Sequence, residues 1–376
     1  MKKAMFMVLG FLPLTLLSQL TTNSFVHNSI SRDYLTYQPA VYTGNSAVPL
    51  VIALHGLGDN MNNFTNISMN LIADTANFIV VTPQAILETQ ITNSTAWNSG
   101  AQAFGFTLNP TIDDIGFLNE LIDTISANYN IDSQRIYFCG FSMGGFMSQR
   151  LACESNTQIA AIASVAGTIG GAINCSPGRA VPVCHFHGTA DGTVAYSGNQ
   201  YGNDAEDLVE FWALNNSCGS SPTVTILPDL ANDGYTVTHS LYDGCTDNAD
   251  VEFYSVDAAG HEWLSPPPTN DIFYTAEIWK FFQKHSLSLN PVDVTELETC
   301  KGLEIFPNPS SGNIQLKTQN GDTKILVYSV SGQLIFEDQV AEKQQTLDLT
   351  HLPNGSYYLN VINRGETIVE KLQIIH

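Results

Sequence analysis

The sequence predicts an α/β domain, with a mostly parallel sheet flanked by helices, followed by a small all-β sandwich. Over most of the chain, apolar strand-like runs alternate with amphipathic helical segments, which is the pattern of a parallel sheet covered on both faces. After Pro291 the helical period disappears, and short strands are separated by Asn-Gly, Ser-Gly and Arg-Gly turns. The chain has 376 residues, of which 44% are hydrophobic, so two folded units with a sizeable core are expected.

The elements of the α/β domain are predicted from apolar periodicity and from the glycines and polar turns between the runs. The strands are expected within residues 48–56, 77–84, 136–139, 159–167, 181–188 and 251–261. The helices between them are expected at 64–76, 111–129, 204–216 and 270–285, with a further helix directly after Ser142.

The chain divides into four segments. Residues 1–19 are predicted to be a secretory signal peptide, because two lysines precede an apolar run that is short for a membrane span. The α/β catalytic domain is placed at 27–288, a linker at 289–302 and the β-sandwich at 303–376. We expect no membrane span once the signal peptide is removed.

The charge balance excludes some partners. Acidic residues outnumber basic ones by 36 to 14, which gives a formal charge of −22. Nucleic acid and anionic membrane surfaces are therefore not expected as partners, because both are bound by clustered Lys and Arg. No CxxC or HExxH motif is present, so neither a metal site nor a cofactor is predicted.

The cysteines of an exported protein can form disulfides. Cys218 and Cys245 flank a predicted hairpin and form the best candidate pair, and Cys153 with Cys175 is the second. Two further cysteines lie inside apolar strand-like runs and are expected to be buried thiols: Cys139 and Cys184.

One serine stands where a strand turns sharply into a helix. Gly140-Phe-Ser142-Met-Gly144 is a G-x-S-x-G element that follows an apolar strand and precedes a helical pattern. Such a turn forces the serine into a strained backbone conformation, so its neighbours must be small. Ser142 is therefore the candidate nucleophile.

A serine nucleophile needs a base and an acid, which in this arrangement follow it along the chain. Asp191 comes directly after the strand at 181–188, and His261 follows the last strand. His261 would take the proton of Ser142, and Asp191 would fix the tautomer of the imidazole. Three other acidic residues remain alternatives for the acid: Asp243, Asp257 and Glu262.

The negative oxygen of a tetrahedral intermediate needs N–H donors. The backbone N–H of Met143 is one candidate, and the N–H of Leu57, in the glycine-rich turn LHGLGDN, is the other. His55 is expected to brace that turn. Trp263, two positions after His261, is the leading candidate for a wall of the substrate pocket, and Trp97 is the second candidate for substrate binding.

Residues 31–286 resemble the secreted carbohydrate-esterase and polyhydroxybutyrate-depolymerase-like branch of the α/β-hydrolases, which includes feruloyl esterases. The resemblance is carried by PLVIALHGLGDN, TAWNSG, the stretch around GFSMGG, VPVCHFHGTADGTV and VEFYSVDAAGHEW. It implies the α/β-hydrolase fold and an ester substrate, and its triad falls on Ser142, Asp191 and His261.

The C-terminal segment resembles the type A sorting domain of the type IX secretion system, through FPNPSSG, VYSVSGQ and LPNGSYYL. The resemblance implies export by a Bacteroidota-type bacterium to the cell surface or medium. The secretion machinery is then a partner of this segment.

The leading hypothesis is a secreted serine esterase that acts through an acyl-serine intermediate. Its substrates would be feruloyl or acetyl esters of plant polysaccharide, or a polyester. A serine peptidase with the same triad and a non-catalytic surface binding protein are the alternatives. Labelling by a fluorophosphonate probe separates the binding protein from either enzyme.

Overall fold

The computed structural model of the chain describes residues 18–266, 269–287, 303–318, 323–329, 334–340, 344–363 and 366–376. Its contacts divide the chain into two compact units, residues 1–289 and 290–376. The predicted signal peptide, apart from its last two residues, the predicted linker and Cys300 lie outside the described residues.

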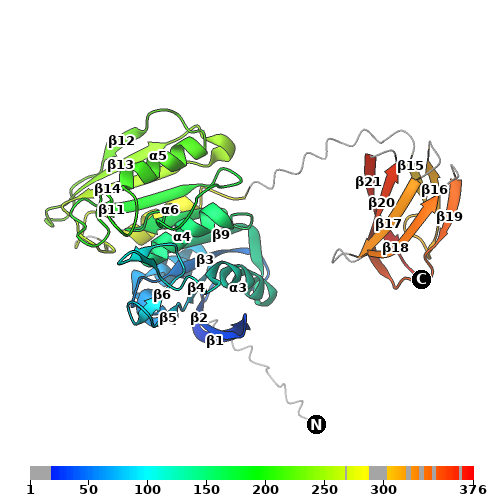
Figure 1. Cartoon of the computed structure of the whole chain (residues 1–376), viewed down its shortest axis with the longest axis horizontal. Coiled ribbons are helices and arrows are strands. Elements are labelled where there is room, and N and C mark those ends of the chain that lie inside the picture. The colour runs from blue at the N-terminus through cyan, green and yellow to red at the C-terminus, as the bar shows by residue number, and fades with distance from the viewer. Residues whose placement is uncertain are drawn as a thin grey trace, which may run out of the picture. The chain divides into compact units, whose positions relative to one another are not determined.

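The first unit is built on a ten-stranded sheet (Figure 1). The strands from β4 across to β14 run parallel, and the strands at both edges are antiparallel. In spatial order the strands are β1 (Gln19–His27), β2 (Ile30–Gln38), β4 (Ile79–Pro83), β3 (Val48–Leu54), β9 (Ile131–Phe141), β10 (Ala161–Val165), β11 (Val183–Gly188), β14 (Val251–Asp257), β13 (Thr236–Tyr242) and β12 (Thr223–Ile226).

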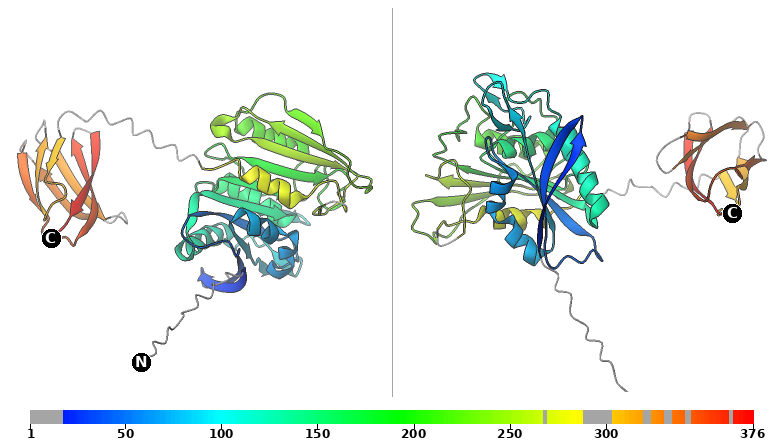
Figure 2. Two further views of the ribbon diagram at one scale, coloured as in Figure 1. Left: turned by 180° about the vertical axis from the view of Figure 1, so that it is seen from behind. Right: turned by 90° about the horizontal axis from the view of Figure 1, so that it is seen from below.

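Helices cover both faces of this sheet, as the two views of Figure 2 show. One face carries α3 (Asp114–Asn128), α4 (Met143–Glu154) and α5 (Ala205–Asn215), whose apolar side chains share one core. The other face carries α1 (Met61–Phe64), α2 (Met69–Ala76) and α6 (Tyr274–Phe282), which share a second core. The prediction of a mostly parallel sheet flanked by helices is confirmed.

Short elements complete this unit. They are the 3-10 turns η1 (Thr65–Ile67) and η2 (Thr246–Asn248) and the strands β5 (Ile86–Glu88), β6 (Ser94–Ala96), β7 (Gln102–Ala103) and β8 (Phe106–Thr107). The helix expected at 64–76 is divided, because Ser68 adopts a left-handed conformation with φ 66° between η1 and α2. An amphipathic pattern persists across such a break, so periodicity alone does not reveal it.

The sheet begins earlier than expected. Strand β1 starts at Gln19, whereas the sequence placed the start of the domain at residue 27. The two residues between β1 and β2, Asn28 and Ser29, have φ of 47° and 65°, which is the geometry of a tight type I′ hairpin. Most side chains of β1 are exposed, so it lacks the apolar run that marks a strand in a sequence; Phe25, which packs 5.5 Å from the ring of Phe117, is its main anchor.

The cysteines pair as predicted. Disulfides join Cys218 to Cys245 and Cys153 to Cys175. Cys139 and Cys184 are free and buried. Burial raises the pKa of the Cys139 thiol well above its usual value, so this thiol is not reactive.

One buried carboxylate lies on β14, away from the predicted site. Glu252 accepts hydrogen bonds from His239 at 2.9 Å and from Lys284 at 2.7 Å. Burial alone would raise the pKa of Glu252, but these two partners lower it to about 2. Glu252 therefore stays ionised across the neutral and mildly acidic range.

In the described residues of the second unit, every regular element is a β-strand. A three-stranded sheet holds β15 (Leu303–Phe306), β16 (Asn313–Thr318) and β19 (Gln344–Asp348), and a four-stranded sheet holds β18 (Leu334–Val340), β17 (Thr323–Ser329), β20 (Gly355–Asn363) and β21 (Glu366–Ile374). All pairings between these strands are antiparallel. Leu316, Val327 and Leu359 are fully or almost fully buried in a single core formed by both sheets. Within the described residues of the whole chain, no helix is long and apolar enough to span a bilayer.

Candidate active site

Ser142 sits in a strained turn between β9 and α4. Its φ of 54° and ψ of −120° lie outside the regions that L-residues favour. Its backbone N–H donates to the carbonyl of Val165, at 2.8 Å, which fixes the turn to the neighbouring strand. A Cβ on Gly144 would lie 1.9 Å from the carbonyl oxygen of Leu54, and one on Gly140 would lie 2.2 Å from the backbone of Gly144. The two glycines are therefore required for the strand and the helix to approach each other.

Three predicted residues meet at the ends of three strands. The hydroxyl of Ser142 donates to Nε2 of His261 over 2.9 Å. The opposite nitrogen of the ring, Nδ1, donates to Oδ2 of Asp191 over 2.7 Å. The side chain of His261 is about one-fifth exposed, whereas that of Asp191 is fully buried. The arrangement can move a proton from the serine to the histidine while the carboxylate balances the new positive charge.

The carboxylate of Asp191 is held from both sides. Oδ1 accepts the backbone N–H groups of Thr193 at 2.8 Å and Val194 at 2.9 Å. Nε2 of His187 lies 3.5 Å from Oδ2, the oxygen that also contacts His261. Burial alone would raise the pKa of Asp191, but its contacts with His187, His261 and the backbone N–H of Thr193 outweigh burial and lower the pKa well below its usual range. Asp191 is therefore ionised at neutral and mildly acidic pH.

The alternative acids bind other groups. Asp257 accepts the hydroxyl of Thr189 at 2.9 Å. Glu262 accepts the hydroxyl of Tyr235 at 2.7 Å and the backbone N–H of Gly260 at 3.2 Å. For Asp243 the structure gives a backbone contact only, from the N–H of Gly219 to its carbonyl oxygen. The contact that the chemistry needs, a carboxylate against Nδ1 of His261, is made by Asp191.

The glycine-rich turn after β3 lies against the serine. A Cβ on Gly56 would be 3.5 Å from Cβ of Ser142, and the next residue, Leu57, is 43% exposed. In the described part of the chain, the backbone N–H groups of Leu57 and Met143 have no intramolecular acceptor among the hydrogen bonds found. Two unsatisfied N–H groups beside a serine hydroxyl are what an oxyanion site needs.

His55 fixes this turn through hydrogen bonds of both its ring nitrogens. The histidine is fully buried; Nδ1 donates to the carbonyl of Gly56 at 2.8 Å, and Nε2 accepts the N–H of Ala85 at 3.1 Å. Burial lowers the pKa of His55, which keeps the ring neutral with the proton on Nδ1. This contact pattern is that of a brace.

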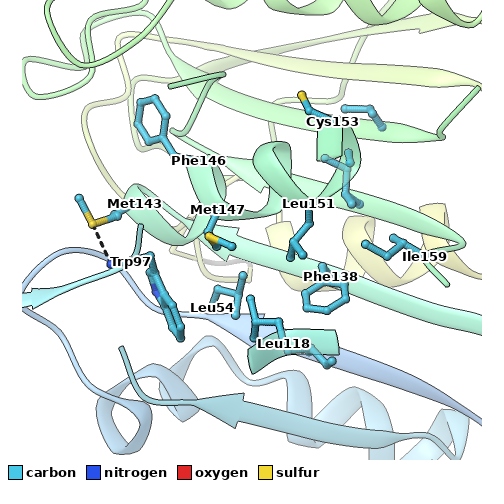
Figure 3. Close-up of a cluster of buried hydrophobic side chains, with 14 of the residues drawn as sticks. Leu54, Trp97, Leu118, Phe138, Met143, Phe146, Met147, Leu151, Cys153 and Ile159 are labelled. Atoms are coloured by element: carbon cyan, nitrogen blue, oxygen red, sulfur yellow. Dashed lines mark hydrogen bonds between the residues drawn. The ribbon is translucent and has the colours of Figure 1, made fainter. Parts of the chain in front are cut away.

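Trp97 does not lie where a substrate could reach it. Its side chain is 0% exposed, so the expectation that it binds substrate is corrected. Its indole N–H donates to the carbonyl of His55 at 2.9 Å, and its backbone N–H donates to the sulfur of Met143 at 3.3 Å. Figure 3 shows Trp97 packed with Leu54 beneath α4. Trp97 supports both sides of the predicted oxyanion site from the core.

Trp263 lines a cavity that also includes Phe141, the residue before the serine. Its indole N–H donates to the hydroxyl of Thr275 at 3.0 Å, which fixes the ring. The cavity has a volume of about 290 Å³, and Phe141 in its lining has its ring 4.8 Å from that of His261. Phe64 and Phe273 form further walls, and polar groups of Asp59, Asn63, Asn66, Ser68 and Ser265 also line the cavity.

Sequence reasoning missed two parts of the site. The aromatic walls come from α1, the end of β9 and the segment before α6, and no local motif connects these positions. His185 and His187, on β11, carry a signal that could have been used, because His187 lies four residues before Asp191 at the end of one strand. Nε2 of His187 donates to the carbonyl of Val194 at 2.7 Å, so Nδ1 accepts from Nε2 of His185 at 3.1 Å.

Comparison with known protein families agrees with this geometry. Residues 38–210 match the phospholipase/carboxylesterase family, and residues 304–375 match the secretion system C-terminal sorting domain. The chain combines an α/β-hydrolase domain with a sorting domain. The sorting-domain prediction is confirmed, and with it the prediction of a secreted protein of the type IX route.

Individual relatives resemble the hydrolase domain at modest identity. The chain is 27% identical to a bifunctional acetylxylan esterase/xylanase of Neocallimastix patriciarum over 75% of this chain and 37% of that protein. It is 27% identical to feruloyl esterase B of Piromyces equi over 59% of this chain and 41% of that protein. The chain thus spans about two-fifths of the length of these two relatives.

One relative is covered over most of its length. The chain is 27% identical to a probable feruloyl esterase C of Aspergillus clavatus over 69% of this chain and 86% of that protein. Among solved structures, acetyl xylan esterase from Aspergillus awamori matches with a TM-score of 0.49 and 14% identity, over 70% of this chain and 99% of that one.

Proposed function

We propose that this protein is a secreted serine carboxylic-ester hydrolase with Ser142, His261 and Asp191 as its catalytic residues. The observation that carries the proposal is the unbroken chain of hydrogen bonds from the buried Asp191 through His261 to a serine on a strained turn. The relatives named as feruloyl and acetylxylan esterases support the ester as the bond that is cleaved.

The reaction follows from the contacts. Nε2 of His261 takes the proton of Ser142 as Oγ attacks the ester carbonyl, and the backbone N–H groups of Leu57 and Met143 bind the oxygen that becomes negative. The carbonyl re-forms, the alcohol leaves with the proton from His261, and an acyl-serine remains. Water then gives its proton to His261 and attacks the acyl group, and the acid is released as Ser142 recovers its proton.

The cavity beside Phe141 is the site proposed for the acyl group. Its aromatic walls, Phe64, Trp263 and Phe273, suit a flat ring, and its polar lining suits ring substituents. A feruloyl ester fits this description better than an acetyl ester, which would leave most of the 290 Å³ unfilled. We therefore place feruloyl esters of plant polysaccharide first, with acetyl esters and polyesters after them.

A hydrolysis panel tests the proposal. The full chain is assayed beside Ser142→Ala on methyl ferulate, acetylated xylan, poly(3-hydroxybutyrate) and p-nitrophenyl acetate. We expect turnover of methyl ferulate and of p-nitrophenyl acetate, with the loss of both in Ser142→Ala. Full p-nitrophenyl ester activity in Ser142→Ala would exclude this serine as the nucleophile. Polyester clearing without ferulate turnover would reassign the substrate and leave the triad standing.

A further inference from the structure

A second, larger cavity lies outside the candidate active site, on the face of the sheet that carries α5. It has a volume of about 730 Å³, which is in the range of ligand sites. One wall is formed by α5, and the floor is formed by β13 and β14; Figure 1 shows these elements side by side, with β12 at the outer edge. We call it the α5–β13 groove.

The helix and strand repeats decide which side chains of α5 and β13 line the groove. Glu206, Glu210 and Leu214 are spaced four residues apart on α5, so they form one stripe, and all three are exposed. Thr238, Ser240 and Tyr242 alternate along β13, so they face the same side of the sheet. The groove therefore places carboxylates opposite a row of hydroxyls.

Several hydrogen-bonding groups that line the groove are free to bind a ligand. Within the described part of the chain, no intramolecular hydrogen bond is found for the hydroxyls of Thr238, Ser240 and Tyr242, or for the carboxylate of Glu210. Phe253 pairs with Ser240 across the strands and adds a ring to the same face. A ligand with many hydroxyls would use these donors, acceptors and rings together.

Covalent and hydrogen-bonded contacts tie the walls of the groove together at both ends of α5. The disulfide between Cys218 and Cys245 joins the segment after α5 to the segment after β13, and Cys218 itself lines the groove. At the other end, the hydroxyl of Tyr196 donates to Glu206 at 3.0 Å and contacts the hydroxyl of Ser255 at 3.1 Å. Walls fixed in advance lower the entropic cost of binding.

The end of the groove at Tyr196 lies close to the candidate catalytic acid, Asp191. Tyr196 lies on the loop that connects Asp191 to α5, and its ring packs 5.7 Å from the ring of His187. His187 in turn lies 3.5 Å from Asp191. The groove and the candidate active site thus share one loop.

We propose that the α5–β13 groove binds the glycan of an esterified, uncharged polysaccharide. Among the described residues that line it, the charged ones are Glu206 and Glu210, and none is cationic, so an anionic polymer is repelled. A cationic polymer would use only these two exposed carboxylates, whereas a neutral sugar chain uses the hydroxyls and the aromatic rings as well. The proposal rests on the proposed function, because the glycan is the part of the ester substrate that carries the acyl group.

Binding is measured apart from catalysis. The full chain with Ser142→Ala is titrated with soluble neutral arabinoxylan in affinity electrophoresis and calorimetry, and Glu210→Ala with Tyr242→Ala is added to it. We expect these two substitutions to weaken binding about tenfold, from one lost hydrogen bond to a charged group and one lost ring contact. Tyr358→Ala, at an exposed tyrosine of the second unit, is the matched control and should bind like the parent.

A second variant keeps the test valid if the first pair of substitutions disturbs folding. Ser220→Trp adds bulk at an exposed loop position that lines the groove, so it should block the groove without disturbing the core. Binding to the neutral glycan should not change between about 0.05 and 0.5 M salt, whereas a cationic ligand would be released. Unchanged glycan binding in both groove variants, no glycan binding by the parent, or salt-sensitive binding of polylysine in its place, would each overturn the proposal.

Kinetics separate this proposal from the proposed function. With Ser142 intact, the groove variants should raise the KM for feruloylated arabinoxylan about tenfold and leave kcat/KM for p-nitrophenyl acetate within about twofold. If the wild-type chain cleaves no ester at all, the proposed function fails, and the binding titration still decides on the groove. If the wild-type chain cleaves esters and the groove variants have the same KM for feruloylated arabinoxylan as the wild type, the groove proposal alone fails.

Discussion

Replacing Asp191 with asparagine removes the negative charge and turns one acceptor oxygen into an NH₂ donor, with almost no change in the size of the side chain. Two backbone N–H groups, of Thr193 and Val194, point at Oδ1. They need an acceptor, so the amide oxygen of the asparagine must take this position and the NH₂ group must face His261. The NH₂ group would then donate to Nδ1 of His261, which becomes an acceptor.

This exchange inverts the tautomer of the catalytic histidine. With Nδ1 as acceptor, the ring proton moves to Nε2, which faces Ser142 at 2.9 Å in the present structure. A protonated Nε2 cannot take the proton of the serine, and the positive charge that forms on the ring loses its carboxylate. We expect kcat to fall by about 10⁴, equivalent to roughly 5.5 kcal/mol of transition-state stabilisation.

The assay is steady-state hydrolysis of p-nitrophenyl acetate near neutral pH, beside far-ultraviolet circular dichroism to verify the fold. Asp257→Asn is the matched control, because Asp257 was an alternative acid and instead accepts the hydroxyl of Thr189. The control should keep kcat within about twofold. A fall of less than about 100-fold in Asp191→Asn would refute the argument from the tautomer.

Three further predictions concern stability. Gly144→Ala places a methyl group 1.9 Å from the carbonyl of Leu54, where only the backbone can yield; we expect a loss of more than about 4 kcal/mol of unfolding free energy, visible as loss of soluble protein. Replacing Cys218 and Cys245 by serine opens a loop of 27 residues and should cost about 3.5 kcal/mol in urea unfolding under oxidising conditions. The pKa of Glu252 is lowered to about 2, so its contribution is present above pH 4.5 and is lost as the pH falls toward 2; Glu252→Gln should reduce this acid-induced loss of unfolding free energy by up to roughly 3 kcal/mol, and an unchanged acid limb would contradict the assignment.

The sequence predicted those parts of the site that topology determines. In a parallel sheet the carboxyl ends of the strands share one edge, so residues directly after apolar runs are brought together. Ser142, Asp191 and His261 each follow such a run, and the structure joins them through two hydrogen bonds. The disulfide between Cys218 and Cys245 could be predicted because these two cysteines flank a hairpin that the sequence indicates.

The parts that could not be predicted depend on packing between distant segments. Trp97 is a large aromatic residue, and the sequence does not show whether its ring faces the substrate or the core. The structure buries it with Leu54 beneath α4. Strand β1 was missed because an edge hairpin buries few side chains and so leaves little apolar periodicity. The break at Ser68 was missed because one left-handed residue does not disturb the apolar pattern on either side.

Each element of the site has a local cost that the surrounding fold offsets. Ser142 adopts an unfavourable backbone conformation, and the hydrogen bond from its N–H to Val165 together with the buried core around α4 keeps it there. Asp191 is a buried charge, and two N–H groups of its own loop and two histidines stabilise it. His261 is held by its two hydrogen bonds and by the ring of Phe141, and it carries the proton between the serine, the leaving alcohol and the water. The rigid parts of the fold therefore hold the strained serine and the fixed charge, and the proton moves on the residue between them.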